Sequence, residues 1–341
     1  MSRCKLEEFI SYEQPAKYIV DSDQYDDSYE TPVLTAGKSF ILGYTDEKNN
    51  IFDNLPVIIF DDFTTSVQFV DFPFKVKSSA MKLLKNTEQA DIKYCYYLLK
   101  FLQHTPENHK RQWLSATSQN IVELPTIEKQ KNIVMKLDKI LEVIDNQNNQ
   151  LELLDEAIKA RFVEMFGDPN IEFKYSSVKF NDLVARMTKG PFGSDMKKDL
   201  FVPKGEDTYK VYIQINAIQK NQSLGEYYIS KEYFDRKVSR FELFPNDYII
   251  TCDGTLGKYL KLDENMEKGV ISPSLLRLTL QNDKINDKYF ENIWDFYMLG
   301  LMKKEARNAC LVHLPSAKKI GEISIPVPPL ELQNQFASFV Q

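Results

Sequence analysis

The chain has 341 residues, and its 43 Lys and Arg against 49 Asp and Glu give a formal net charge of −6 at pH 7. Its hydrophobic content of 43% and aromatic content of 12% exclude a disordered tail, and its length suggests about two globular domains. The acidic balance argues against a protein that binds nucleic acid through bulk positive charge.

The sequence has no sign of a membrane-spanning or secretory segment. No stretch approaches the roughly 18 to 20 uncharged apolar residues that a membrane helix needs, and residues 1–8 lack an apolar signal core. The four cysteines form no CxxC pair and the three histidines have no zinc-finger spacing, so we expect no metal site and interpret His313 and the cysteines as packing residues. We therefore expect a cytoplasmic protein without a membrane partner.

The first part of the chain, residues 1–121, has the pattern of a mixed α/β domain. Residues 57–60, Val-Ile-Ile-Phe, are typical of a buried strand, and residues 92–102 are predicted to form a helix. A boundary follows at Leu124-Pro125-Thr126, where a proline ends an extended segment and a threonine can cap a helix.

A single long helix is predicted to begin after Thr126. No Pro or Gly occurs from there to Phe166, and Gly167-Asp168-Pro169 is a typical helix stop. Such a helix has about 40 residues and a length of roughly 60 Å.

The apolar residues of this helix follow a heptad pattern, which is typical of a coiled-coil seam. The seam residues are Ile133, Leu137, Ile140, Ile144, Gln147, Leu151, Leu154 and Ile158. Because an isolated helix would expose this stripe to water, we expect another long helix beside it. The alternative is an ordinary core helix, but the length and the polar run 146–150 favour an extended spacer.

The second part of the chain repeats the first. Residues 325–333 echo residues 122–130, 203 positions later, and a second long helix is predicted to begin at Pro329. Four further pairs occur in the same order: 5–10 with 179–184, 56–64 with 245–255, 93–94 with 288–289, and 115–116 with 316–317. The second copy includes a strand at 248–251 and a helix at 287–304. The repeat predicts an order of domain, long helix, domain and start of a second long helix.

These features resemble the specificity subunit of type I restriction-modification systems. The resemblance is carried by the junction 124–130 with its helix, the repeat of that junction at 328–333, and two segments of the second domain, 189–194 and 247–258. It spans essentially the whole chain, and the order of the motifs makes it specific.

The resemblance implies an α+β protein in which two similar mixed α/β target-recognition domains are separated by a long coiled-coil-type helix. Its expected parts are domain 1 at 1–121, the spacer helix at 122–170, domain 2 at 171–326 and the truncated start of a second helix at 327–341. Each domain would read one half of a bipartite site on double-stranded DNA, and the helices would dock methylation subunits. The restriction subunits of the same system would complete the complex. The chain itself would bind no cofactor, because S-adenosylmethionine, ATP and Mg are expected on partner subunits.

The sequence departs from the family pattern in two places. The second helix stops at Gln341, about 13 residues after it begins, so we expect a trimmed chain or a natural truncation that pairs with another copy or another subunit. The first domain lacks a counterpart of residues 190–194.

The candidate DNA contacts of the second domain lie in glycine-rich loops and one amide-rich segment. Glycine N–H groups and lysines suit phosphate oxygens, and Gln or Asn amides can read adenine. The candidates are Lys189, Gly190, Pro191, Phe192, Gly193, Ser194, Lys197, Lys198, Gln214, Asn216, Thr251, Gly254, Thr255 and Lys258. The alternatives are a Gly-Pro turn with solvated lysines, a tight hairpin turn, and the polar face of a strand that includes Gln214 and Asn216.

The corresponding loops of the first domain supply Thr35, Lys38, Thr64 and Thr65 as candidate contacts. Asp61 and Asp62 either accept hydrogen bonds from cytosine N4 or cap a turn.

No catalytic motif is found: the sequence has no GxSxG, no HExxH, no cofactor-binding glycine loop and no Asn/Asp-Pro-Pro-aromatic tetrapeptide. We therefore expect no catalytic residues. Two alternatives stay open: a self-contained DNA-modifying enzyme with an unrecognised site, and a truncated specificity-like protein that dimerises or modulates the complex.

Overall fold

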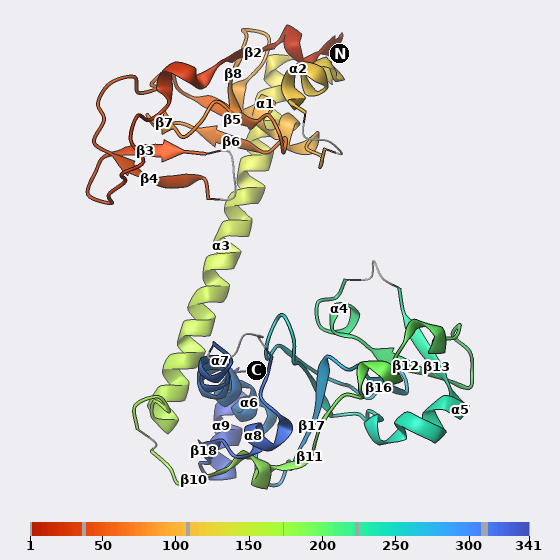
Figure 1. The fold of residues 1–341 in the computed structure, drawn as a ribbon. Coiled ribbons are helices and arrows are strands. Elements are labelled where there is room, and N and C mark those ends of the chain that lie inside the picture. The colour runs from red at the N-terminus through yellow and green to blue at the C-terminus, as the bar shows by residue number, and fades with distance from the viewer. Residues whose placement is uncertain are drawn as a thin grey trace. The chain divides into compact units, whose positions relative to one another are not determined.

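The computed structural model of the chain describes residues 2–35, 39–106, 110–172, 174–221, 225–307 and 313–340. It contains two compact units, residues 1–149 and 150–341. The long helix α3, Ile127–Phe166, begins in the first unit and ends in the second (Figure 1). No helix among the described residues is long and apolar enough to span a membrane.

The described residues of the first unit form three small sheets. The four-stranded sheet has the order β2-β8-β5-β6 and is antiparallel. Its strands are β2 (Ile10–Glu13), β8 (Met81–Asn86), β5 (Val57–Asp61) and β6 (Val67–Val70). In the three-stranded sheet, β3 (Thr31–Leu34) pairs antiparallel with β4 (Ile41–Thr45) and parallel with β7 (Lys75–Val76). The third sheet pairs β1 (Ser2–Lys5) with β9 (Ile121–Leu124). The helices are α1 (Ile92–Phe101) and α2 (Gln112–Ser115).

The second unit repeats this topology strand by strand. The four-stranded order is β11 (Val184–Lys189), β17 (Leu275–Leu280), β14 (Tyr248–Thr251) and β15 (Tyr259–Lys261). Strand β12 (Thr208–Tyr212) pairs antiparallel with β13 (Tyr227–Ser230) and parallel with β16 (Gly269–Ile271). Strand β10 (Ser177–Lys179) pairs with β18 (Ser324–Pro326). Strands β10 to β18 thus follow β1 to β9 in order and pairing, which agrees with the repeat predicted from sequence.

The helices of the second unit are α4 (Gln214–Ala217), α5 (Lys231–Tyr233), α6 (Asp287–Ile293), α7 (Leu299–Arg307), α8 (Ala317–Gly321) and α9 (Leu330–Val340). A π-helical turn at Trp294–Met298 joins α6 to α7. The helix predicted over 287–304 is therefore one continuous helical segment with a local change of pitch.

The central strands of the four-stranded sheets are buried on both faces. In β5, Ile58 and Phe60 pack in the core that includes α1, whereas Val57 and Ile59 pack in the core on the other face. Strand β14 divides its side chains between two cores in the same way. This two-sided burial explains the unbroken apolar runs in the sequence.

Helix α3 has the bounds that the sequence predicts. It ends where Gly167 takes a left-handed conformation with φ of +86° and donates its N–H to the carbonyl of Val163. Its last turns pack into the second unit, where Phe162 stacks on Tyr289 at 5.5 Å and Phe166 meets Phe336 at 5.5 Å between ring centroids.

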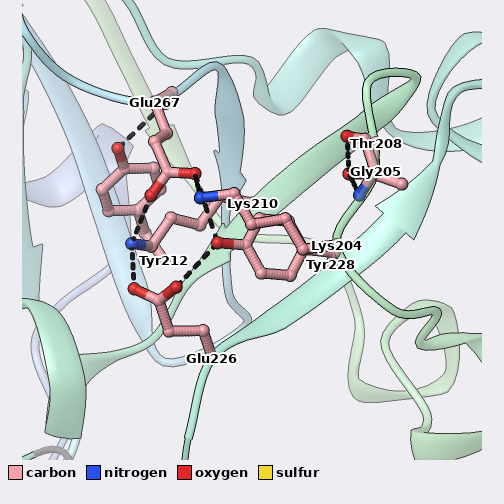
Figure 2. A network of polar contacts seen from close by, with 8 residues as sticks. All are labelled: Lys204, Gly205, Thr208, Lys210, Tyr212, Glu226, Tyr228 and Glu267. Atoms are coloured by element: carbon pink, nitrogen blue, oxygen red, sulfur yellow. Dashed lines mark hydrogen bonds and ion pairs between the residues drawn. The ribbon is translucent and has the colours of Figure 1, made fainter.

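The three-stranded sheet of the second unit is tied together by a network of charged and phenolic groups (Figure 2). Lys210 on β12 bonds Glu226 and, at 3.0 Å, Glu267, while Lys204 contacts Glu267 at 2.7 Å. The hydroxyl of Tyr228 lies 2.7 Å from Glu226 and 3.2 Å from Glu267. The hydrogen bond from Lys204 is the largest cause that lowers the pKa of Glu267 to about 2, against the opposing effect of burial.

This network predicts an acid-dependent contribution to stability. The pKa of Glu267 is below the value of about 4.3 for an unfolded chain, so its stabilisation is complete above that value and is lost as the pH falls towards 2. Glu267→Gln is expected to lower the free energy of unfolding at pH 7 by less than about 1 kcal/mol, because the side chain is 38% exposed. In urea unfolding this difference from the unmodified chain should vanish as the pH approaches 2. Glu206→Gln, at an exposed carboxylate of the same unit, is the control; an equal difference at all pH values would contradict the assignment.

Candidate nucleic-acid interface

The loop after β11 is fixed at its start by a close backbone contact. Gly190 donates its N–H to the carbonyl of Leu275 at 2.8 Å, and a Cβ at this position would lie 2.0 Å from the carbonyl oxygen of Ser272. Only glycine fits so near to another backbone. Pro191 is buried beside it, so Gly190 and Pro191 shape the loop and do not present groups to a ligand.

The same loop is fixed again a few residues later. The hydroxyl of Tyr233 donates to the carbonyl of Asp195 at 3.1 Å, and Lys237 lies 3.6 Å from the Asp195 carboxylate. Between the two fixed points, residues 192–194 are exposed, and Phe192 has 78% of its surface in solvent. Lys189, Lys197 and Lys198 are also exposed, and none forms an ion pair with a described residue. This lysine-bearing loop, residues 190–198, together with Lys189 at the end of β11, presents an aromatic ring, a hydroxyl and three ammonium groups on a base held at Gly190 and Asp195.

The loop between β14 and β15 contains a second set of predicted residues. Gly254 and Gly257 have positive φ angles of +69° and +76°. Thr251 is fully buried, and its hydroxyl bonds the carbonyl of Thr255 and the N–H of Lys258, so it closes the turn. The hairpin interpretation is therefore correct for Thr251, while Gly254 and Lys258 are exposed at the surface.

The amide-rich segment lies against this loop. Gln214 and Gln219 donate their side-chain N–H groups to the hydroxyl of Thr255, at 3.4 and 3.2 Å. The strand expected through Gln214 and Asn216 is wrong, because β12 ends at Tyr212 and Gln214–Ala217 forms the short helix α4. The ladder between β12 and β16 also ends at Tyr212, so the following residues bond locally, as Ala217 N–H does to the Ile213 carbonyl at 3.0 Å.

A cavity of about 800 Å³ opens beside the β14–β15 loop. Its walls include Ile218, Leu256 and Leu299, and Lys258 and Lys303 also line it. Gly257 lies against Leu299 so closely that a Cβ there would be 2.3 Å from a methyl carbon of that residue. Gly257 is thus a packing glycine, unlike Gly254, whose nearest neighbour would be the amide of Gln214 at 4.0 Å.

His313 is not the packing residue that the sequence suggested. Its side chain is 47% exposed, and Nδ1 lies 2.5 Å from the carboxylate of Asp253, at the base of the β14–β15 loop. Cys95 and Cys252 are buried, as expected, and burial raises the pKa of both thiols to about 12. Among the described residues, no group of three or more potential metal ligands occurs.

In the first unit, the β5–β6 loop corresponds to the β14–β15 loop. Asp61 accepts hydrogen bonds from the N–H groups of Phe63 and Thr64, which confirms a turn cap. Asp62 is 1% exposed and pairs with the equally buried Lys82 at 3.2 Å. Thr65 is 2% exposed and donates to the carbonyl of His104 at 2.6 Å, so of the two threonines only Thr64 faces solvent.

The β3–β4 connection of the first unit corresponds to the segment that contains α4. Thr35 lies at its start and donates its backbone N–H to the carbonyl of Phe40 at 2.9 Å. Lys38 lies outside the described residues.

Sequence motifs did not place the first-unit counterpart of the lysine-bearing loop. Topology places it between β2 and β3, at residues 14–30. This connection has the sequence DSDQYDDSYE at 21–30, and its Asp23 pairs with Lys77. Only the strand order reveals the correspondence, because the two connections share no motif and differ in charge, with a net −4 at 14–30 and −1 at 190–207.

The predicted seam of α3 is largely exposed. Ile140, Ile144, Leu151 and Leu154 are between 44% and 62% exposed, while Leu137 and Ile158 are half-buried. The described part of the chain therefore leaves an apolar stripe along the middle of α3 open to solvent.

The two glycines of the lysine-bearing loop give a matched test of its construction. Gly190→Ala is expected to lower the free energy of unfolding by about 1 to 3 kcal/mol, because the added methyl group collides with the Ser272 backbone. Gly193→Ala is the control, since a Cβ there would meet no atom within 4 Å. Urea unfolding measures both; equal stability of the two variants would contradict the close contact.

No family model matches the chain. The specificity subunit of the type I restriction enzyme EcoR124I/EcoR124II from Escherichia coli is 39% identical over 191 residues, which cover 52% of this chain and 46% of that protein. The chain thus spans less than half of the length of this relative.

A solved structure extends the similarity to the fold. The crystal structure of the type I restriction-modification system S subunit from M. genitalium matches with a TM-score of 0.61 and 13% identity, covering 99% of this chain and 88% of that chain. At this identity the match shows a shared fold, with two sheet-rich domains and a long helix between them. By sequence over half of its length and by fold over nearly all of it, the chain resembles the specificity subunits of type I restriction-modification systems, as its motifs predict.

Proposed function

We propose that the chain is the sequence-specific DNA-recognition subunit of a type I restriction-modification complex. Residues 1–121 and 171–326 are the recognition domains, and each reads one half of a bipartite target. The helix within 122–170 and the helix that begins within 327–341 dock methylation subunits. The observation that carries the proposal is the duplicated topology, in which the same nine-strand frame presents corresponding loops twice.

In the second domain, the proposed contacts come from two neighbouring surfaces. Lys189, Lys197 and Lys198 bind phosphate oxygens around the exposed tip 192–194. The backbone of Gly254 and the ammonium group of Lys258 contact the DNA from the second loop. Gln214, Asn216 and Thr255 supply amide and hydroxyl groups for base edges. Gly190, Pro191 and Thr251 support these loops from inside.

In the first domain, Thr64 at the β5–β6 loop and Thr35 with Lys38 at the β3–β4 connection are the corresponding proposed contacts. Thr65 supports its loop from inside, as Thr251 does. The acidic connection 14–30 repels phosphates, so this domain depends more on base-edge contacts and on partner subunits for its affinity.

The chemistry of the complex is assigned to partner chains. The sequence has no motif for S-adenosylmethionine, ATP or nuclease chemistry, and we propose that the methylation and restriction subunits bind S-adenosylmethionine, ATP and Mg. The exposed apolar stripe of α3 favours a helical partner. A long helix of a methylation subunit is the proposed occupant, and a second copy of this chain is the alternative.

The direct test is the methylation pattern produced by the chain together with methylation subunits of its own system. A host that expresses all the subunits should acquire adenine methylation at a split target, with two specific halves and a fixed gap. A host without this chain is the control. Methylation that lacks a bipartite target, or that persists without the chain, would contradict the proposed function.

Phe192 gives a residue-level test of the same interface. An exposed aromatic ring can contact a thymine methyl group of duplex DNA or insert between two base steps, so Phe192→Ala should weaken target binding by the methylation complex by about tenfold. Phe101→Ala is the matched control, because Phe101 is also highly exposed, at 85%, but lies at the end of α1. Fluorescence anisotropy with a labelled target measures both, and equal affinities would remove Phe192 from the interface.

A further inference from the structure

Two buried glutamines, Gln130 and Gln333, occupy equivalent places in the two copies and are not among the proposed DNA contacts. Gln130 lies one turn into α3, and Gln333 lies one turn into α9. Both side chains are 0% exposed. A fully buried amide must satisfy two N–H donors and a carbonyl acceptor inside the protein, so its partners define its function.

Gln130 joins three segments of the first unit. Its Nε2 donates to the carbonyl of Pro125 at 2.8 Å and to the carbonyl of Gln89 at 3.1 Å. Its Oε1 accepts from the N–H of Asp91 at 2.8 Å, and Asp91 is the N-cap of α1. One side chain therefore binds the turn before α3, the β8–α1 connection and the start of α1.

Gln333 makes the same three bonds in the second unit. Its Nε2 donates to the carbonyl of Pro328 at 2.8 Å and to that of Lys284 at 3.4 Å. Its Oε1 accepts from the N–H of Asn286 at 2.8 Å, and Asn286 is the N-cap of α6. Each of the three partners of Gln333 thus occupies the same place in the fold as the corresponding partner of Gln130. Two unrelated buried amides would not share all three.

The hydrogen bonds of both glutamines help to set the direction of α3. In the first unit, a second contact two turns further along α3 completes the attachment, since Asp138 pairs with Lys93 of α1 at 2.7 Å and bonds Tyr97. In the second unit, Gln333 holds α9, and Phe336 of α9 packs on Phe162 and Phe166 at the end of α3.

The length of α3 makes small changes of direction large at its far end. Its 40 residues extend roughly 60 Å, so a tilt of about 3° moves the other end by about 3 Å. One base pair of DNA rises about 3.4 Å along the duplex axis. A loss of a few degrees of angular precision at either attachment is therefore equivalent to one base pair.

We propose that Gln130 and Gln333 are paired positioning residues that fix the number of base pairs between the two DNA half-sites. This inference rests on the proposed function and adds a role for residues that do not touch DNA. Gln130 sets the angle between α3 and the first recognition domain, and Gln333 sets the position of α9, against which the end of α3 packs in the second. The presence of two donors is essential, because a carboxylate would place negative charge against two carbonyl oxygens.

The test uses the complex of the chain with methylation subunits and DNA in which the two half-sites are separated by spacers that differ by one base pair. Gln130→Met and Gln333→Met keep the length of the side chain and remove all three hydrogen bonds. The unmodified complex should prefer one spacer by about tenfold, and each variant should reduce this preference to about threefold or less. The half-site sequences should stay the same. Gln150→Met, at an exposed position of α3, is the control and should keep the preference.

The outcomes separate this inference from the proposed function. If the unmodified complex shows no bipartite methylation, the proposed function fails first. If the folded Met variants retain the unmodified spacer preference, or lose half-site recognition and rate without broadening the spacer, the positioning role is overturned. If those variants do not fold, Tyr97→Phe and Asn334→Ala weaken the same attachments through exposed or half-buried contacts, and an unchanged preference in both would overturn the role.

Discussion

The structure depends on central strands that are buried on both faces of the four-stranded sheet in each unit. Strands β5 and β14 divide their side chains between a helical core and a core beneath the three-stranded sheet. Because such a strand has no solvent face, its register is fixed by packing on both sides. The loops that follow β5 and β14 therefore leave the sheet at a defined place, and these are the loops that carry Thr64 and Lys258.

The loops on these strands contain two kinds of residue: buried residues that hold the loop in shape, and exposed residues that a ligand can reach. Thr251 and Thr65 have the chemistry of DNA contacts, but both hydroxyls bond to backbone carbonyls within the protein. Gly190 and Gly257 allow close packing, whereas Gly254 and Phe192 are exposed to solvent. A glycine-rich or hydroxyl-rich motif thus contains two classes of residue, and burial distinguishes them.

The sequence predicts the structure where the signal is local. The bounds of α3 could be predicted because a proline precedes it, a glycine follows it, and no breaker lies between. The helix at Gln214 was missed because it depends on where the ladder of β12 ends, which partner strands decide. The connection 14–30 was missed for a similar reason, since only topology equates it with the loop that carries Lys197.

The acidity of the chain takes a different meaning once the two copies are aligned by topology. Residues 172–325 carry 24 basic and 21 acidic groups, whereas residues 1–121 carry 13 and 17. The equivalent connections differ in the same direction, since 190–207 has a net charge of −1 and 14–30 a net charge of −4. The nine strands are retained and the loop chemistry has changed. Under the proposed function, a duplicated frame with different loops is the physical means by which one chain reads an asymmetric target, because each half-site meets a different set of side chains on the same scaffold.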